Sequence, residues 1–438
     1  MRKTALAGLL LLPAVLMGQP KSWTLQECID YALDHNITVK QSEISTAEKE
    51  IALNTAENSR LPGVAASAGE NLSFGRGLTA DNTYANTNTT SSSFSLGGSI
   101  PVFQGFEIRD NIRLSKLDLA ASMSDLEKAK DDIRVAVAQA YVQILYSKEI
   151  LRVAEGQVAI DSQQLERIEA MKSNGKASAA QVAAQQATLA QSRLSETQAA
   201  NNLRIAILDL TQLLELPSPE GFDVVVPSES ALQPGLLMNP EDIFMQAEQI
   251  KPAVQSEKIR LDYMEQAITR AKGAYLPTIS LNGGIGTNFY TSSGYEHQSF
   301  GDQVKNNFSQ YVALSLNIPI FSKFATRNSV RTAQLNFNRQ QLQLENVKKS
   351  LYKEIQQAYY NAVTSQEKAR SSTEAAASAK QAFELEKEKY ENGKSGITEY
   401  NESKNRWMEA ESNLLQARYE SLYQEKLLDF YRGEDLSF

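Results

Sequence analysis

Apolar and polar residues alternate along two stretches of the chain, each about ten residues long. In the first stretch the apolar positions are Phe94, Leu96, Gly98, Ile100 and Val102. In the second they are Val312, Leu314, Leu316, Ile318 and Ile320. A period of two residues over this length is typical of a strand that spans a membrane. Weaker alternation predicts a partner strand before each stretch, one ending at Leu72 and Phe74 and the other containing Ile279, Leu281 and Ile285.

The residues between the paired strands are polar in both halves. Residues 79–92 are almost entirely Asn, Thr, Ser and Ala, and residues 290–308 are rich in Ser, Gly, Asn and Gln. We expect both to be exposed loops. A half-buried strand pair in a soluble sheet is the alternative for the strands themselves. If the strands cross a membrane, several chains must share one barrel, because four strands leave edges that lipid does not tolerate.

The chain contains a tandem duplication. Pro101-Val102-Phe103 returns as Pro319-Ile320-Phe321, and Asn174-Gly175-Lys176 returns as Asn392-Gly393-Lys394, each at an offset of 218 residues. Arg109 to Arg113 returns at the same offset as Arg327 to Arg331. The repeats predict a first unit at 19–235 and a second unit at 236–438, after a signal peptide that the N-terminal pattern described below predicts at 1–18.

Each half follows one order of elements: an amphipathic helical segment, the strand pair, and a long helical hairpin. The helical segments run over about 25–59 and 240–274. The outgoing helix of the first hairpin has no proline from 105 to 172, which gives roughly 100 Å of helix. Its heptad positions are Val137, Ile144, Leu151, Val158 and Leu165. The matching second-half positions are Ile355, Ala362, Ala369, Ala376 and Phe383, and we expect both sets to pack against neighbouring helices.

The N-terminus has the pattern of a secretory signal. Arg2 and Lys3 precede a short apolar run that ends near Gly18, and the run is too short to span a bilayer. Cys28, the only cysteine, lies too late to support lipoprotein processing. The formal net charge of −8 argues against nucleic acid as a partner, since phosphate binding needs clustered Lys and Arg.

Residues that could carry catalysis or hold a cofactor or metal are not arranged in any known motif. Two histidines occur, far apart in sequence. Gly393-Lys394-Ser395 lacks the earlier glycine of a phosphate-binding loop, because position 388 is Glu388. We therefore expect no enzyme activity, no cofactor and no metal site.

Glu399 and Glu402 follow the second hairpin turn and share a helix face, because they are three residues apart. In a symmetric oligomer they would form two stacked acidic rings, which favour cations and set the charge of a pore constriction. A solvated helix face is the alternative. The equivalent residues of the first hairpin, Gln181 and Ala184, carry no charge, so one hairpin per chain would contribute.

The order of elements and several short motifs resemble the TolC family of outer-membrane efflux and secretion channels. The motifs are Trp23 to Cys28 at the start of the first helix, Leu-Pro before the first and third strands, Pro-Val-Phe and Pro-Ile-Phe after the second and fourth, and Tyr390-Glu391-Asn392-Gly393 at the second turn. One departure is Ser395, where some members carry an arginine that takes part in closing the channel.

The resemblance implies a mixed α and transmembrane β fold. Long helical hairpins would form an α-barrel tunnel in the periplasm, and four strands per chain would contribute to a trimeric 12-stranded β-barrel in the outer membrane. It also implies a periplasmic adaptor and an inner-membrane pump as partners, beside outer-membrane lipid. It places acidic rings at Glu399 and Glu402, and we expect the adaptor to contact the hairpin tips at Gly175, Lys176, Gly393 and Lys394.

The predicted function is that of a passive exit duct for a tripartite efflux pump or a type I secretion system. The alternative is a structural envelope coiled-coil protein without channel activity. The duct explains the membrane-strand pattern at equivalent places in both halves, which a fibrous protein would not need. Residues 216–235, rich in Pro, Ser and Glu, are expected to form an irregular connection.

Overall fold

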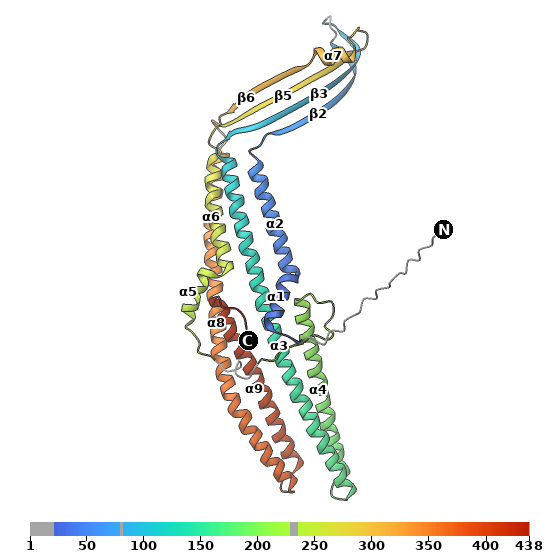
Figure 1. Cartoon of the computed structure of the whole chain (residues 1–438), viewed down its shortest axis with the longest axis vertical. Helices are drawn as coiled ribbons and strands as arrows, with labels where there is room; N and C mark the ends of the chain where they lie inside the picture. The colour runs from blue at the N-terminus through green and yellow to red at the C-terminus, as the bar shows by residue number, and fades with distance from the viewer. Residues whose placement is uncertain (1–21, 79–81, 228–234, 438) are drawn as a thin grey trace, which may run out of the picture. The chain divides into compact units, whose positions relative to one another are not determined.

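The structure is a computed structural model that describes residues 22–78, 82–227 and 235–437. The chain divides into two compact units, and each unit contains parts of both sequence halves (Figure 1). One unit comprises 42–127 and 252–349, and the other comprises the remaining segments. The predicted signal peptide, 1–18, lies outside the described residues. The boundary predicted between the repeats near 235 stays a prediction.

A four-stranded antiparallel sheet forms one end of the first of these units (Figure 1). Its strands, in spatial order, are β2 (Gly63–Leu78), β3 (Tyr84–Gln104), β5 (Thr278–Ser292) and β6 (Ser309–Asn317). The register places Leu96 opposite Ile285, and Leu281 opposite Leu314. The predicted alternation is thus confirmed across the sheet, since apolar side chains of neighbouring strands share one face.

The polar stretches expected as loops are largely ordered elements, so that expectation was wrong. β3 already begins at Tyr84, so most of 79–92 is strand. The second stretch holds a short helix, α7 (Phe300–Asn306), which Ser299 caps by accepting from the backbone N–H of Asp302. α7 packs on β5, and its Phe300 ring contacts Phe289 at 5.0 Å between centroids. The second alternating stretch is shorter than predicted. β6 ends at Asn317, so Ile318 and Ile320 lie beyond the strand.

Helices adjoin the other end of this sheet. They are α6 (Pro252–Gly273), most of α2 (Ile37–Asn58), and the first parts of α3 (Glu107–Ser173) and α8 (Ala325–Glu391). Gly105, with φ +58°, meets the end of α6 so closely that an added Cβ would lie 2.4 Å from the Gly273 carbonyl oxygen. The reverse also holds, because a Cβ on Gly273 would lie 2.5 Å from the Gly105 oxygen. The two backbones touch directly there.

The second unit contains the two helical hairpins. The first joins α3 to α4 (Ala179–Leu213), and the second joins α8 to α9 (Ile397–Arg432). Both outgoing helices have 67 residues, and the first agrees with the proline-free stretch from 105 to 172. In the part of the chain that the structure describes, no helix combines the length and apolar content needed to cross a bilayer.

The heptad seams are confirmed with one correction. All five second-half positions, from Ile355 to Phe383, are buried, as are Val137 and Ile144. Leu151, Val158 and Leu165 are only half-buried, and beyond Ile144 four buried residues are spaced by seven in a different register. These residues are Ser147, Ala154, Asp161 and Ile168. The two registers are the two core positions of one heptad. The position that the sequence pattern marked is buried up to Ile144, and the other position is the more buried one beyond it.

Each predicted amphipathic segment is two helices. The first breaks at Asn36, between α1 (Leu25–His35) and α2, and the second at Lys251, between α5 (Pro240–Ile250) and α6. Both residues are extended and donate their backbone N–H four residues back, to Ala32 and Ala247. The Asn36 side chain accepts from Thr38, which stabilises the first break. At the second, Pro252 excludes helical geometry for the residue before it.

The connection expected to be irregular contains a short strand. β4 (Asp223–Val224) pairs in parallel with β1 (Ser22–Trp23). Tyr141 of α3 donates its hydroxyl to the Val225 carbonyl at 2.6 Å, and Lys148 donates to Val224 at 3.1 Å. The connection is therefore fastened to α3 over 223–225.

Candidate functional site

Glu399 and Glu402 both lie on the exposed face of α9, within its first two turns. The opposite face of the same turns is buried and carries Tyr400 and Lys404. Glu402 forms an ion pair with Arg406 at 3.6 Å, with both side chains largely exposed. The predicted shared face is confirmed, and the role of this face in a pore constriction stays a prediction.

The two hairpin turns are built alike. Gly175 and Gly393 have φ values of +69° and +70°, a left-handed conformation that favours glycine. The following residues, Lys176 and Lys394, each donate the backbone N–H five residues back at 2.8 Å, which closes the last helical turn. Both lysine side chains are exposed. The predicted contact residues thus form two similar exposed tips.

Near the tips, α3 is linked to the end of α8. The Gln164 amide donates to the Tyr390 hydroxyl at 2.7 Å, although 226 residues separate them. Arg167 donates to the Glu391 carbonyl oxygen at 3.2 Å and lies 5.4 Å from the centre of the Tyr390 ring. Burial raises the pKa of Tyr390, so its hydroxyl stays protonated at neutral pH. These contacts hold one hairpin against the other.

Ser395 contacts its own hairpin. Its hydroxyl donates to a carboxylate oxygen of Glu386, which also pairs with Lys389 at 3.1 Å. The bond from Ser395, followed by the lysine, lowers the pKa of Glu386. The arginine that the family resemblance suggests is thus replaced by a hydroxyl that tightens the turn.

A buried ion pair lies deeper in the hairpin unit, and the sequence analysis missed it. Lys404 of α9 donates to Asp161 of α3, and both side chains are 0% exposed. Ser192 of α4 donates to the other Asp161 oxygen at 2.5 Å, and Gln185 to its backbone carbonyl at 3.3 Å. Three helices from both hairpins meet at one carboxylate. The sequence signal for this pair is Asp161 itself, a charged residue that is spaced by seven from the buried Ala154 and Ile168.

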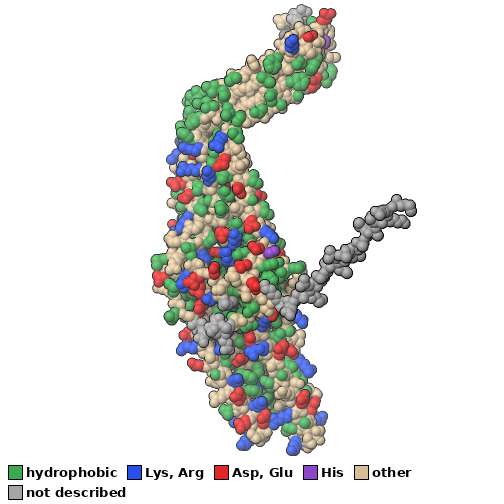
Figure 2. Space-filling model, viewed as in Figure 1, with side chains coloured by type: hydrophobic (Ala, Val, Ile, Leu, Met, Phe, Trp, Pro, Cys, Tyr) green, Lys and Arg blue, Asp and Glu red, His purple; other side chains and the backbone are tan. Residues whose placement is uncertain are grey.

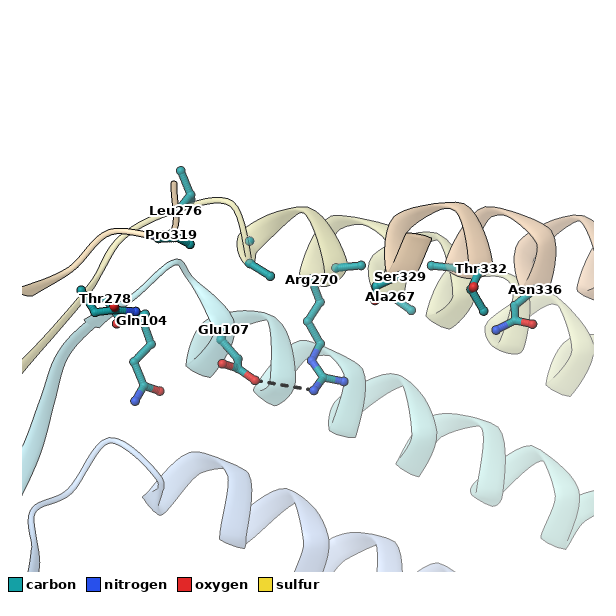
Figure 3. Close-up of a pocket in the computed structure, with 15 residues that line it drawn as sticks. Gln104, Glu107, Ala267, Arg270, Leu276, Thr278, Pro319, Ser329, Thr332 and Asn336 are labelled. Carbon is teal, nitrogen blue, oxygen red and sulfur yellow. Dashed lines mark ion pairs between the residues drawn. The ribbon is translucent and has the colours of Figure 1, made fainter. Parts of the chain in front are cut away.

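A cavity of about 740 Å³ lies where strands give way to helices in the sheet-containing unit (Figure 3). Glu107 and Arg270 face each other across it at 3.6 Å, and the rest of its lining is small or uncharged. Among the described residues, no group of three His, Cys, Asp or Glu side chains could hold a metal ion.

Comparison with known families decides what these hairpins and strands belong to. The sequence profile of the outer membrane efflux protein family matches residues 28–215 and 244–434. The chain belongs to the outer membrane efflux protein family. The family match covers both halves of the duplicated chain, so the first and second hairpins are each part of it.

Two relatives illustrate how far this outer membrane efflux protein has diverged. It is 24% identical to the outer membrane protein TolC of Escherichia coli over 360 residues, 79% of this chain and 71% of that protein. It is 20% identical to the outer membrane efflux protein BepC of Brucella suis, over 81% of this chain and 73% of that one.

Solved structures of the same fold match almost the whole chain. The Campylobacter jejuni CmeC outer membrane channel superposes with a TM-score of 0.79 at 19% identity, over 94% of this chain and 87% of that chain. The open state of the Neisseria gonorrhoeae MtrE outer membrane channel gives 0.74 at 19% identity, over 93% and 88%. The predicted combination of helical tunnel and β domain is confirmed.

Family membership also confirms the predicted function and location. This outer membrane efflux protein is an outer-membrane efflux channel that extends into the periplasm. A structural coiled coil without channel activity is not favoured. The family is one of channel proteins and not of enzymes.

Proposed function

We propose that three copies of the chain form one passive exit duct, which a periplasmic adaptor joins to an inner-membrane pump. The observation that carries this proposal is the order of the sheet, β2-β3-β5-β6. Among the described strands, β2 and β6 each have one neighbour and thus one open edge. Open edges are costly in lipid, because their backbone N–H and C=O groups have no water to bond with.

The strand directions fit closure by identical copies. Neighbouring strands are antiparallel throughout, so β6 runs opposite to β2. The β6 edge of one copy can pair with the β2 edge of the next and continue the antiparallel pattern. Three copies would close the sheet on itself, and their helices would surround one lumen.

Within that duct, Glu399 and Glu402 are proposed to line the constriction and favour cations. The second hairpin supplies both residues. Their side chains are exposed in one copy of the chain, so they are free to face a shared lumen. The exposed tips with Gly175, Lys176, Gly393 and Lys394 are proposed to contact the adaptor. The chain is proposed to have no catalytic role and no cofactor, with transport powered by the pump.

Native mass spectrometry of the detergent-purified protein, with single-channel recording in a planar bilayer, tests this proposal. The expected result is the mass of a trimer and a small conductance that prefers cations. A monomer, or a protein that never inserts, would refute the duct. A trimer that inserts but prefers anions would refute only the role of the two glutamates.

A further inference from the structure

An aromatic and basic module occurs twice where the sheet meets the helices. In the first copy the Phe103 and Phe106 rings pack edge to face at 5.2 Å, and in the second Phe321 and Phe324 do so at 5.5 Å. The interplanar angles are 88° and 87°. The second copy repeats the first at the 218-residue offset of the duplication.

In each copy an arginine lies over the second of the two phenylalanine rings. The Arg109 guanidinium lies 4.5 Å from the centre of the Phe106 ring, and that of Arg327 lies 4.3 Å from Phe324. Both rings are on residues with a left-handed backbone, φ +68° and +63°, which is unfavourable for phenylalanine. Both copies therefore hold a phenylalanine in a strained backbone conformation, and in both an arginine lies over its ring.

The module continues the apolar surface of the sheet. On β6, Val312, Leu314 and Leu316 are 81%, 68% and 59% exposed. Beyond the strand, Ile320 is 94% and Phe321 71% exposed. Figure 2 shows hydrophobic side chains gathered over the end of the sheet that adjoins the helices, with Lys and Arg side chains directly below. In an outer-membrane channel this boundary faces the head groups of the periplasmic leaflet.

The two copies differ in one decisive respect. Arg109 is neutralised by its neighbour Asp110, at 3.0 and 2.9 Å from two guanidinium nitrogens. The residue beside Arg327 is Asn328, and none of the carboxylates in the described segments lies within ion-pair distance of Arg327. The second copy also carries Lys323, left-handed at φ +52°, where the first has Gly105. The second copy therefore has two exposed cations, Arg327 over the Phe324 ring and Lys323 directly before Phe324 in the chain.

We propose that Phe321, Phe324, Arg327 and Lys323 bind the head group of an anionic phospholipid in the periplasmic leaflet. A guanidinium can donate two parallel hydrogen bonds to a phosphate, and the ring beneath holds it in place. The aromatic pair sits at the depth where the glycerol and first methylenes of the lipid lie. The first copy, with its internal counterion, contacts lipid without preference for charge. This inference rests on the outer-membrane location and not on the trimer or the adaptor.

The test compares lipid retention by the full-length protein in native mass spectrometry. The protein is purified with equal amounts of phosphatidylglycerol and phosphatidylethanolamine, and the lipids that remain bound are counted. Wild type is expected to retain phosphatidylglycerol preferentially. R327Q should lower that preference about fivefold, the effect of one cation near an anionic surface. R109Q is the matched control and should change it less than twofold.

A second variant keeps the arginine and restores the counterion. N328D copies the Asp110 arrangement beside Arg327 and should lower phosphatidylglycerol retention as R327Q does. Equal losses from R109Q and R327Q, or no loss from either, would overturn the proposal. Displacement of the lipid by millimolar inorganic phosphate would indicate a site for free anions and overturn the assignment to lipid. Arg327 and Asn328 are exposed, so we expect unchanged melting temperatures for R327Q and N328D. R109Q leaves the buried Asp110 carboxylate without its cation, so its lipid retention is compared at a temperature where the variant is fully folded.

Discussion

Lys404 donates to Asp161 across 243 residues of sequence, and neither side chain reaches solvent. The pair joins the return helix of one hairpin to the outgoing helix of the other. Charges are costly to bury, so a buried pair adds little net stability, but removing one of its partners leaves an uncompensated charge. This contact is the buried one among several that join the two hairpins of one chain, since the Gln164–Tyr390 and Arg167–Glu391 contacts lie nearer the tips.

Breaking the pair from one side should destabilise the protein strongly. K404M leaves the Asp161 carboxylate buried without its cation, and we expect a loss of about 3–5 kcal/mol in the free energy of unfolding. The double variant D161L/K404M should recover most of it, because Ser192 can still donate to the Thr188 carbonyl. Chemical denaturation of the purified protein measures both. K394M, at an exposed tip lysine, is the control, and a K404M protein as stable as this control would contradict the argument.

Removing the two candidate constriction charges should reduce ion selectivity. In E399Q/E402Q the reversal potential under a salt gradient should move toward zero, because the acidic rings that favour cations are gone. E409Q changes an exposed glutamate further along the same helix and should leave the reversal potential unchanged. An unaltered value in the double variant would exclude these residues from the constriction.

Loosening the link between the hairpin tips should enlarge the conductance. Y390F removes the hydroxyl that accepts from Gln164, and R167Q removes the cation beside Glu391. The neutral bond from Gln164 contributes about 1 kcal/mol, so losing it together with the Arg167 contacts should give a larger mean conductance in single-channel recordings. Y352F loses a hydrogen bond to Gln356 within one helix and serves as the control. A conductance equal to that of Y352F would show that the link does not restrain opening.

Cys28 should be unreactive in the folded protein. It is fully buried, and burial followed by the nearby Glu27 raises the pKa of its thiol to about 12. Thiolate is the reactive form, so a maleimide at pH 8 should label the chain only after denaturation. The double variant C28S/S173C, with its thiol at an exposed tip, should label at once. Rapid labelling of native wild type would mean that the first helix opens easily.

The strands and long helices could be predicted because their signals are local. Leu314 on its strand and Ile355 on its heptad each repeat with a neighbour two or seven residues away. The structure pairs Leu314 with Leu281 of the neighbouring strand and buries Ile355. The Asp161–Lys404 pair could not be predicted this way, because nothing near either residue indicates the other. Spacing also marked Leu151 where Ala154 is the more buried residue, since the two heptad positions alternate along one face.

Two boundaries were missed although short signals were present. Lys251 before Pro252 indicates a helix break, and the structure breaks there. Ser299 with Asp302 three residues later is a helix start inside a polar stretch expected as a loop. In both cases the prediction followed the average composition of a longer segment, 240–274 or 290–308, and overlooked a signal of two residues within it.

The contact between Gly105 and Gly273 has a consequence for how the chain can change over time. A side chain added at either position would meet a backbone oxygen of the other, at 2.4 or 2.5 Å. A clash with a side chain can be relieved by trimming that side chain, but a clash with main chain has no such remedy. In a suppressor screen, a substitution at one of these two glycines should not be rescued by a second substitution at the other. The crossing from β3 into α3 would then be less free to change than its counterpart in the second half, which carries Lys323 in place of Gly105.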